Sequence, residues 1–245
     1  MSEIRVQNEV DIDGGYFIEG VPGVGLASKI ATDHVIDRLD MTLHATVHAD
    51  GLPEVVIFEQ GGRDLRAPVR IFADEDTGLY AFTSDVLISL VDVEGFADVM
   101  VEWLEDRGVT ATLLSGLPSD TEEDKQLYGV ATGEAGDLLE DAGIDAPDQP
   151  GIIGGPTGAM LYQAADRGLD AACLVAETDP QFPDPIAAQL LLDEGVEKIV
   201  GFDVDTDVLV EQAEQIKEQK QQLAQMIQQA EQHERSQAYP EGMYQ

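Results

Sequence analysis

The chain has 245 residues, of which 43% are hydrophobic, enough to form a sizeable core and to argue against wholesale disorder. Its 49 acidic and 13 basic residues give a net charge of −36, so we expect neither nucleic acid nor anionic membranes as partners. There is no apolar run of about 18 residues, as a transmembrane helix would need. The first residues, Met1–Arg5, lack the features of a signal peptide, so we expect a cytoplasmic protein.

The acidic residues are spread along the whole chain, and lysine is rare. This composition resembles that of cytosolic proteins from halophilic archaea. In molar salt the self-repulsion of such a chain is tolerable, because charges are screened within about 3 Å. The charge therefore indicates habitat more than function.

Strand patterns and helix patterns alternate along most of the sequence. The first half predicts a strand at 15–19, a helix at 26–39, strands at 42–48, 54–59, 69–72 and 78–82, and a helix at 96–107 that Gly108 ends. The second half predicts strands at 109–114, 127–131 and 171–176, and helices at 134–142, 157–167 and 185–194 that Gly143, Gly168 and Gly195 end.

This order of elements predicts an α/β fold. Strands that alternate with helices in the second half indicate parallel strands with crossover helices, and the run of strands at 42–82 indicates mixed or antiparallel pairing. We therefore expect a single three-layer α/β/α domain with a mixed sheet over residues 1–204.

Residues 205–238 have a different pattern, which predicts a long amphipathic helix. Asp205-Thr206-Asp207 supplies capping oxygens and negative charge for its first turn. A heptad-like seam, interrupted by Lys220, is formed by Leu209, Ala213, Ile216, Leu223, Ile227 and Ala230. The helix is expected to pack on its own domain, on a neighbouring subunit, or on both. Tyr239-Pro240 ends it, which leaves residues 239–245 as a flexible tail.

Two glycine-rich turns lie between a predicted strand and a predicted helix. The first, at 20–25, contains Gly23 and Gly25, and the second, at 154–158, contains Gly155 and Gly158. Backbone amides at such turns can hold a phosphate. However, the first turn lacks the Lys-Ser/Thr pair of a P-loop and the third glycine of a dinucleotide-binding motif. We prefer a tight-turn role for both turns, with binding of a small ligand as the alternative.

Other candidates for chemistry are few. His44 and His48 share one face of a predicted strand, but without a cysteine or carboxylate at metal-ligand spacing we expect no metal site. Cys173, the only cysteine, lies in an apolar strand and is expected in the core. Glu177–Pro180 follows a core strand and is either functional or a loop that leads into a helix. Without a catalytic constellation, we expect neither an enzyme nor a cofactor.

Several segments resemble, in order, motifs of the proteasome assembly chaperone family. They are IEGVPGVGL at 18–26, SKIATDHVI at 28–36, SGLP at 115–118, YGVAT at 128–132 and ETDPQFPDPIAA at 177–188. The resemblance implies a three-layer α/β fold, self-association and, in archaeal members, a C-terminal tail that binds proteasome α-subunits. Some members of the family have been labelled as ligases of an ATP-dependent superfamily.

The chain ends in Met243-Tyr244-Gln245, a hydrophobic residue, a tyrosine and a final residue. Proteasome regulators use this signature: the two side chains wedge between α-subunits, and the terminal carboxylate pairs with a lysine. We therefore predict a homo-oligomeric chaperone or adaptor that binds proteasome α-subunits through these three residues. The alternative is a ligase- or phosphorylase-like enzyme that holds a small phosphorylated or nucleoside-like substrate at the glycine-rich turns.

Overall fold

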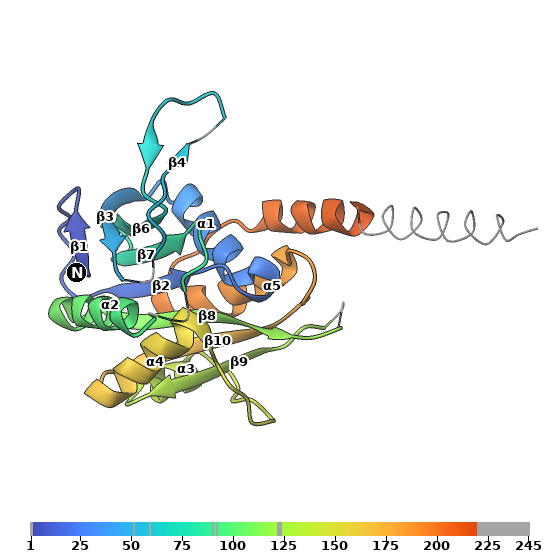
Figure 1. The fold of residues 1–245 in the computed structure, drawn as a ribbon. Coiled ribbons are helices and arrows are strands. Elements are labelled where there is room, and N and C mark those ends of the chain that lie inside the picture. The colour runs from blue at the N-terminus through green and yellow to red at the C-terminus, as the bar shows by residue number, and fades with distance from the viewer. Residues whose placement is uncertain are drawn as a thin grey trace, which may run out of the picture.

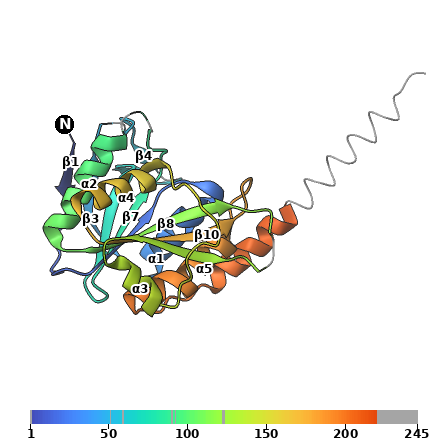
Figure 2. The same cartoon turned by 90° about the horizontal axis from the view of Figure 1, so that it is seen from below.

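The computed structural model describes residues 2–219 except 51, 59, 90, 92, 122 and 123. An eight-stranded mixed sheet forms the middle layer of this part, and helices cover both of its faces (Figure 1, Figure 2). The strand order is β1-β3-β6-β7-β2-β8-β10-β9. The predicted three-layer α/β/α fold with a mixed sheet is therefore confirmed.

The strands of this sheet divide into a parallel centre and antiparallel flanks. They are β1 (Glu3–Val6), β2 (Tyr16–Gly20), β3 (Thr42–His48), β6 (Val69–Asp74), β7 (Leu79–Ser84), β8 (Thr110–Pro118), β9 (Leu127–Thr132) and β10 (Ala171–Thr178). In the centre, β2 pairs parallel with both β7 and β8, and β8 pairs parallel with β10. The pairs β1–β3, β3–β6, β6–β7 and β9–β10 are antiparallel. The mixed pairing predicted for 42–82 is confirmed.

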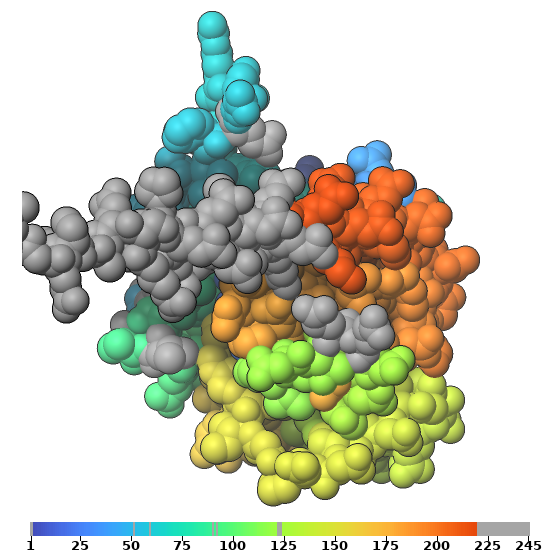
Figure 3. Space-filling model, turned by 90° about the vertical axis from the view of Figure 1, so that its right-hand side faces the viewer, coloured from blue at the N-terminus to red at the C-terminus, as the bar shows by residue number. Residues whose placement is uncertain are grey.

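Two results differ from the strand predictions. β1 was not predicted, and it pairs with β3 at one edge of the sheet. The strand predicted at 54–59 is only β4 (Ile57–Phe58), which joins β5 (Leu65–Arg66) in a separate two-stranded sheet. Both differences concern segments outside the buried centre of the large sheet, because β1 lies at its edge and β4 lies in the other sheet. Figure 3 shows that other sheet in cyan, projecting beyond the rest of the molecule. The apolar pattern that predicts strands is strongest in the buried centre.

The helices lie in two layers. They are α1 (Ala27–Arg38), α2 (Val93–Arg107), α3 (Ala135–Asp141), α4 (Gly155–Arg167), α5 (Pro185–Leu191) and α6 (Glu197–Val200), with the short turns η1 (Val24–Leu26) and η2 (Leu192–Val196). α2 and α4 cover one face of the sheet, and α1, α3, α5 and α6 cover the other (Figure 2). A further helix starts at residue 207 and is described as far as 219.

Each face of the sheet has its own apolar core, because successive side chains of a strand point to opposite faces. On β2, Phe17 belongs to the core under α2 and α4, whereas Ile18 belongs to the core under α1 and α5. The same strands therefore contribute side chains to both cores.

The prediction that Gly195 ends a helix at 185–194 was wrong. α5 ends at Leu191, a π-helical turn follows, and α6 ends at Gly201, which has a φ of 84°. Gly195 is buried instead, and a Cβ atom there would lie 2.5 Å from Cδ1 of Leu174. The glycine therefore allows close packing of the helical segment on β10.

The C-terminal helix starts as its pattern predicts. Leu209 is buried, and Ala213 and Ile216 are half-buried, so the seam faces the body of the protein. The seam residues from Lys220 onward lie outside the described residues. The division into residues 1–204, 205–238 and 239–245 stays a prediction.

Candidate functional site

The parallel strands β2, β8 and β10 end at one edge of the sheet, where the chain changes direction. From β2 the chain continues through α1 toward β3, and from β8 it continues toward β9 and β10 on the other side. In α/β sheets, ligands bind in the crevice outside the carboxyl ends of strands at such a switch point. The loops at this edge of the sheet therefore form the candidate functional site.

The first glycine-rich turn packs directly against the loop after β10. Gly25 has a φ of 56°, and a Cβ atom there would lie 2.2 Å from Cγ2 of Thr178 and 2.8 Å from the carbonyl oxygen of Asp179. The amide of Asp184 donates to the carbonyl oxygen of Gly25 at 2.8 Å. The chain's own atoms thus occupy the space beside Gly25 that a phosphate would need.

The four candidate glycines fall into two pairs. Gly158 resembles Gly25, because a Cβ atom there would lie 2.2 Å from the carbonyl oxygen of Ile153. At Gly155 no heavy atom lies within 4 Å of an added Cβ, and at Gly23 the nearest is 3.9 Å away. Packing therefore accounts for Gly25 and Gly158, and space remains only at Gly23 and Gly155.

Glu19 joins the two turns through a buried hydrogen bond. It is the residue before the first turn, and both of its carboxyl oxygens lie 3.0 Å from the hydroxyl oxygen of Thr157, in the second turn. Burial raises the pKa of Glu19 to about 8, although hydrogen bonds from Thr157 and the Leu114 backbone act in the opposite direction. The carboxyl group therefore holds its proton at neutral pH.

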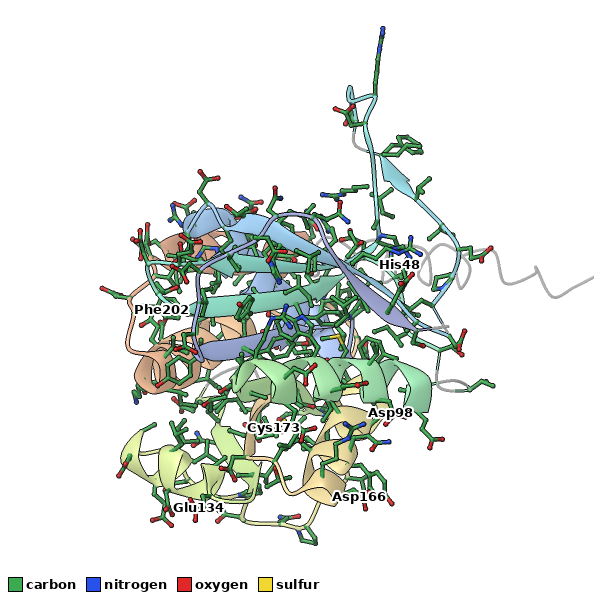
Figure 4. All side chains as sticks on the ribbon, turned by 90° about the vertical axis from the view of Figure 1, so that its left-hand side faces the viewer. His48, Asp98, Glu134, Asp166, Cys173 and Phe202 are labelled. Atoms are coloured by element: carbon green, nitrogen blue, oxygen red, sulfur yellow. The ribbon has the colours of Figure 1, made fainter. Side chains whose placement is uncertain are left out.

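Cys173 lies on β10 and contributes to the same core as Phe17 (Figure 4). It is fully buried, as predicted, and burial raises the pKa of its thiol. A thiol that stays protonated and inaccessible is a poor nucleophile. Cys173 is therefore a residue of the apolar core, as expected from its strand.

A buried ion pair, not predicted from the sequence, connects the loops after β8 and β10. Nζ of Lys125 lies 3.1 Å from Oδ2 of Asp184, and each side chain is 7% exposed. The ammonium group also donates to the carbonyl oxygen of Thr121 at 2.8 Å. Asp184 in turn accepts from the amides of Asp179 and Ala187, which caps α5. Of Glu177–Pro180, the segment singled out in the sequence, the first two residues end β10, and Asp179 and Pro180 begin the loop that Asp184 holds in place.

A cavity of about 590 Å³ lies beside this ion pair, between the two loops and the C-terminal helix. Its volume is in the range that holds small ligands. Phe182, Ile186 and Ile216 give it an apolar wall, and Lys125 and Lys217 contribute positive charge. Four carboxylates also line it, those of Asp120, Asp179, Asp184 and Glu214. This mixture of charges selects no single class of ligand.

His44 and His48, the two histidines of the predicted strand, have structural partners. His44 is buried, its Nδ1 lies 2.8 Å from the carbonyl oxygen of Asn8, and its ring packs against Tyr80. His48 lies 3.2 Å from the hydroxyl oxygen of Thr46. Over the part of the chain that the structure describes, no three histidine, cysteine or acidic side chains come together as metal ligands.

Comparison with known proteins identifies the family to which this fold belongs. A model of the PAC2 family matches residues 17–224. The chain belongs to the PAC2 family. This PAC2 family member is 29% identical over 211 residues to an uncharacterized protein of Methanocaldococcus jannaschii, over 85% of this chain and 84% of that protein.

Solved structures of Pyrococcus furiosus proteins extend the comparison. PbaA, described as an archaeal homologue of proteasome-assembly chaperone, matches with a TM-score of 0.80 and 25% identity over 96% of this chain and 97% of PbaA. PbaB, described as an archaeal proteasome activator, has the same fold, with a TM-score of 0.78 and 22% identity over 91% of this chain and 98% of PbaB. The predicted relationship to proteasome assembly chaperones is confirmed.

Two expectations from the sequence concern membrane spans and partner binding. No helix among the described residues is long and apolar enough to cross a membrane. The predicted binding residues Met243, Tyr244 and Gln245 lie outside the described residues, so their role stays a prediction.

Proposed function

We propose that this chain is a proteasome assembly chaperone or adaptor that works as a homo-oligomer in the cytoplasm of an archaeon. It binds proteasome α-subunits through Met243, Tyr244 and Gln245 and needs no cofactor. The observation that supports this most strongly is the likeness to PbaA, which extends over 96% of the chain.

The direction of the C-terminal helix supports a binding role for the tail. The described part of this helix, residues 207–219, extends away from the sheet and its covering helices (Figure 1). A further 26 residues follow it in the sequence. The three predicted binding residues are therefore far along the chain from the sheet, so binding through them needs no strand of the sheet to unfold.

Binding of purified α-subunits to the full-length protein and to a variant that lacks residues 239–245 tests the proposal. We expect the deletion to abolish binding while the circular dichroism spectrum of the fold is kept. Tyr244→Ala should weaken binding by a few kcal/mol per tail, the scale of a buried aromatic anchor. One residue added after Gln245 should have a similar effect, because it moves the carboxylate away from its lysine.

Gln245→Ala is the matched control, because it keeps the position of the terminal carboxylate and should bind as the parent does. In an oligomer, several tails bind together, so the loss of avidity should exceed the loss measured with an isolated tail peptide. Equal binding by the full-length and the tail-deleted protein would contradict the proposal and favour the enzyme alternative.

A further inference from the structure

Two buried nitrogen atoms beneath α2 have no hydrogen-bond partner in the protein. They are Nε2 of His44, which lies on β3, and Nε1 of Trp103, which lies on α2. His44 is 2% exposed and Trp103 is 6% exposed, and among the residues that the structure describes no donor or acceptor lies within reach of either atom. Buried polar atoms in native proteins are almost always hydrogen-bonded, so both atoms call for a partner.

The two atoms belong to one cluster of rings. The ring centroids of His44 and Trp103 lie 6.1 Å apart, and the ring of Tyr80 lies 5.5 Å from His44 and 5.0 Å from Trp103. A water molecule joins two nitrogen atoms that are roughly 5–6 Å apart, since each hydrogen bond is about 2.9 Å long. The two rings are therefore close enough for one water molecule to bond to both.

The contacts of His44 decide which of its nitrogen atoms carries the hydrogen. Nδ1 lies 2.8 Å from the carbonyl oxygen of Asn8, and a carbonyl oxygen can only accept, so the hydrogen is on Nδ1. Burial lowers the pKa of His44, which favours the neutral ring. In this tautomer Nε2 is an acceptor, whereas Nε1 of Trp103 is always a donor. A water molecule, which both donates and accepts, is complementary to this pair.

The other neighbours of Trp103 cannot satisfy its N–H group. The centroid of the Phe17 ring lies 6.1 Å from that of Trp103, and the guanidinium carbon of Arg107 lies 4.3 Å from the centroid of the indole ring. A phenylalanine has no acceptor atom, and an arginine side chain has only donors. The acceptor for the indole N–H group must therefore come from outside the protein.

We propose that one water molecule, enclosed between β3 and α2, is bound by both His44 and Trp103. The indole N–H group of Trp103 donates to the water oxygen, and the water donates a hydrogen to Nε2 of His44. Buried waters of this kind are part of a protein's structure and bond to polar groups that are otherwise unsatisfied. Together with the hydrogen bond from His44 to Asn8, the water connects α2 through β3 to the segment that precedes β2. This inference concerns the core, so it does not depend on the tail or on proteasome binding.

NMR spectroscopy of the full-length protein, labelled with nitrogen-15, tests the inference. Trp103 is the only tryptophan, so the spectrum contains a single indole N–H signal. We expect a rotating-frame Overhauser cross-peak between this hydrogen and water, with the sign opposite to that of chemical exchange. The nitrogen chemical shifts of His44 should show the neutral tautomer with its hydrogen on Nδ1.

Two variants test whether the water depends on His44. His44→Phe removes the acceptor and fills the space of the imidazole ring, so the cross-peak to water should be lost. Tyr80→Phe is the matched control, because it changes another ring of the same cluster and keeps both nitrogen atoms. Its cross-peak should match that of the parent protein.

The parent protein alone can overturn the inference, even if His44→Phe does not fold. A parent whose indole hydrogen has no cross-peak to water contradicts it, and so does a scalar coupling between the two nitrogen atoms, because such a coupling means that the rings bond directly. A cross-peak that persists in a folded His44→Phe variant also overturns the inference. Loss of the cross-peak in His44→Phe, together with its retention in Tyr80→Phe, supports a water shared by His44 and Trp103.

Discussion

Glu19 is a titratable group inside the core, and its pKa has a consequence for stability. The pKa is about 8 in the folded protein, compared with 4.5 for an unperturbed glutamate. Because the folded value is the higher one, the contribution to stability is fully present below pH 4.5 and is lost as the pH rises to about 8. The loss amounts to about 1.4 kcal/mol per pH unit in that interval.

We therefore expect Glu19→Gln to flatten the pH dependence of the free energy of unfolding between pH 6 and 8. The free energy of unfolding of the variant should increase relative to that of the parent as the pH rises, because the amide has no proton to lose. Denaturant unfolding at several pH values measures this. Thr157→Val is the control: it removes the hydrogen bond but leaves the carboxyl group, so its pH dependence should remain. If parent and Glu19→Gln have parallel profiles, the carboxyl group titrates normally.

Gly25 and Gly23 lie two residues apart in the same turn and allow a matched comparison. Gly25→Ala adds a Cβ atom 2.2 Å from Thr178 at a residue with positive φ, so we expect a destabilisation of about 2–4 kcal/mol. Gly23 has extended backbone angles, and its added Cβ would lie 3.9 Å from the nearest atom. Gly23→Ala should therefore change the melting temperature little.

The same pair of variants separates the two interpretations of the turn. If Gly25 serves packing, neither variant has a ligand affinity to lose. Tight nucleotide binding by the parent that disappears in a folded Gly25→Ala variant would show that the turn is a ligand site.

At the scale of elements, local pattern predicted the helices and central strands well. The strand at 15–19 and the helix at 26–39 were within one residue of the structure at each end, because apolar periodicity and glycines are local signals. Gly108 and Gly168 end α2 and α4 with positive φ, as predicted. Gly195 misled the prediction, since a glycine needed for close packing looks the same in a sequence as one that ends a helix.

The contacts of the candidate site were harder to predict, because they join distant segments. Lys125 pairs with Asp184 and Glu19 with Thr157, and no spacing in the sequence relates these residues. Glu19 did leave a visible signal, an acidic residue within an apolar strand. The ribbon of β4 and β5 left only an apolar run at 54–59, and nothing local in that run shows that it leaves the body of the protein.

At the scale of the whole molecule, the net charge of −36 should govern stability. Acidic side chains such as Glu134 and Asp166 are exposed on the outside (Figure 4), where they repel one another at low ionic strength. Molar KCl shortens the range of this repulsion to about 3 Å. We therefore expect the melting temperature to rise by about 5–10 °C between dilute buffer and molar KCl, equivalent to a few kcal/mol.

Scanning calorimetry across a KCl series measures this increase. An uncharged osmolyte at equal osmolality is the control, because it leaves the charges unscreened and should give a smaller rise. Melting temperatures that stay flat or fall as KCl increases would contradict the halophilic interpretation.

The place of β2 in the sheet also sets the order in which the protein can fold as it is synthesised. β2 is made among the first residues, yet it lies between β7 and β8, and β8 ends only at Pro118. At about 5–20 residues per second, the ribosome needs roughly 5–20 s to make the intervening chain. During that time Phe17 and Ile18, which later join the two cores, have no completed sheet around them. Until residue 118 has been made, the central strand of a nascent chain therefore has at most one of its two neighbours in the sheet.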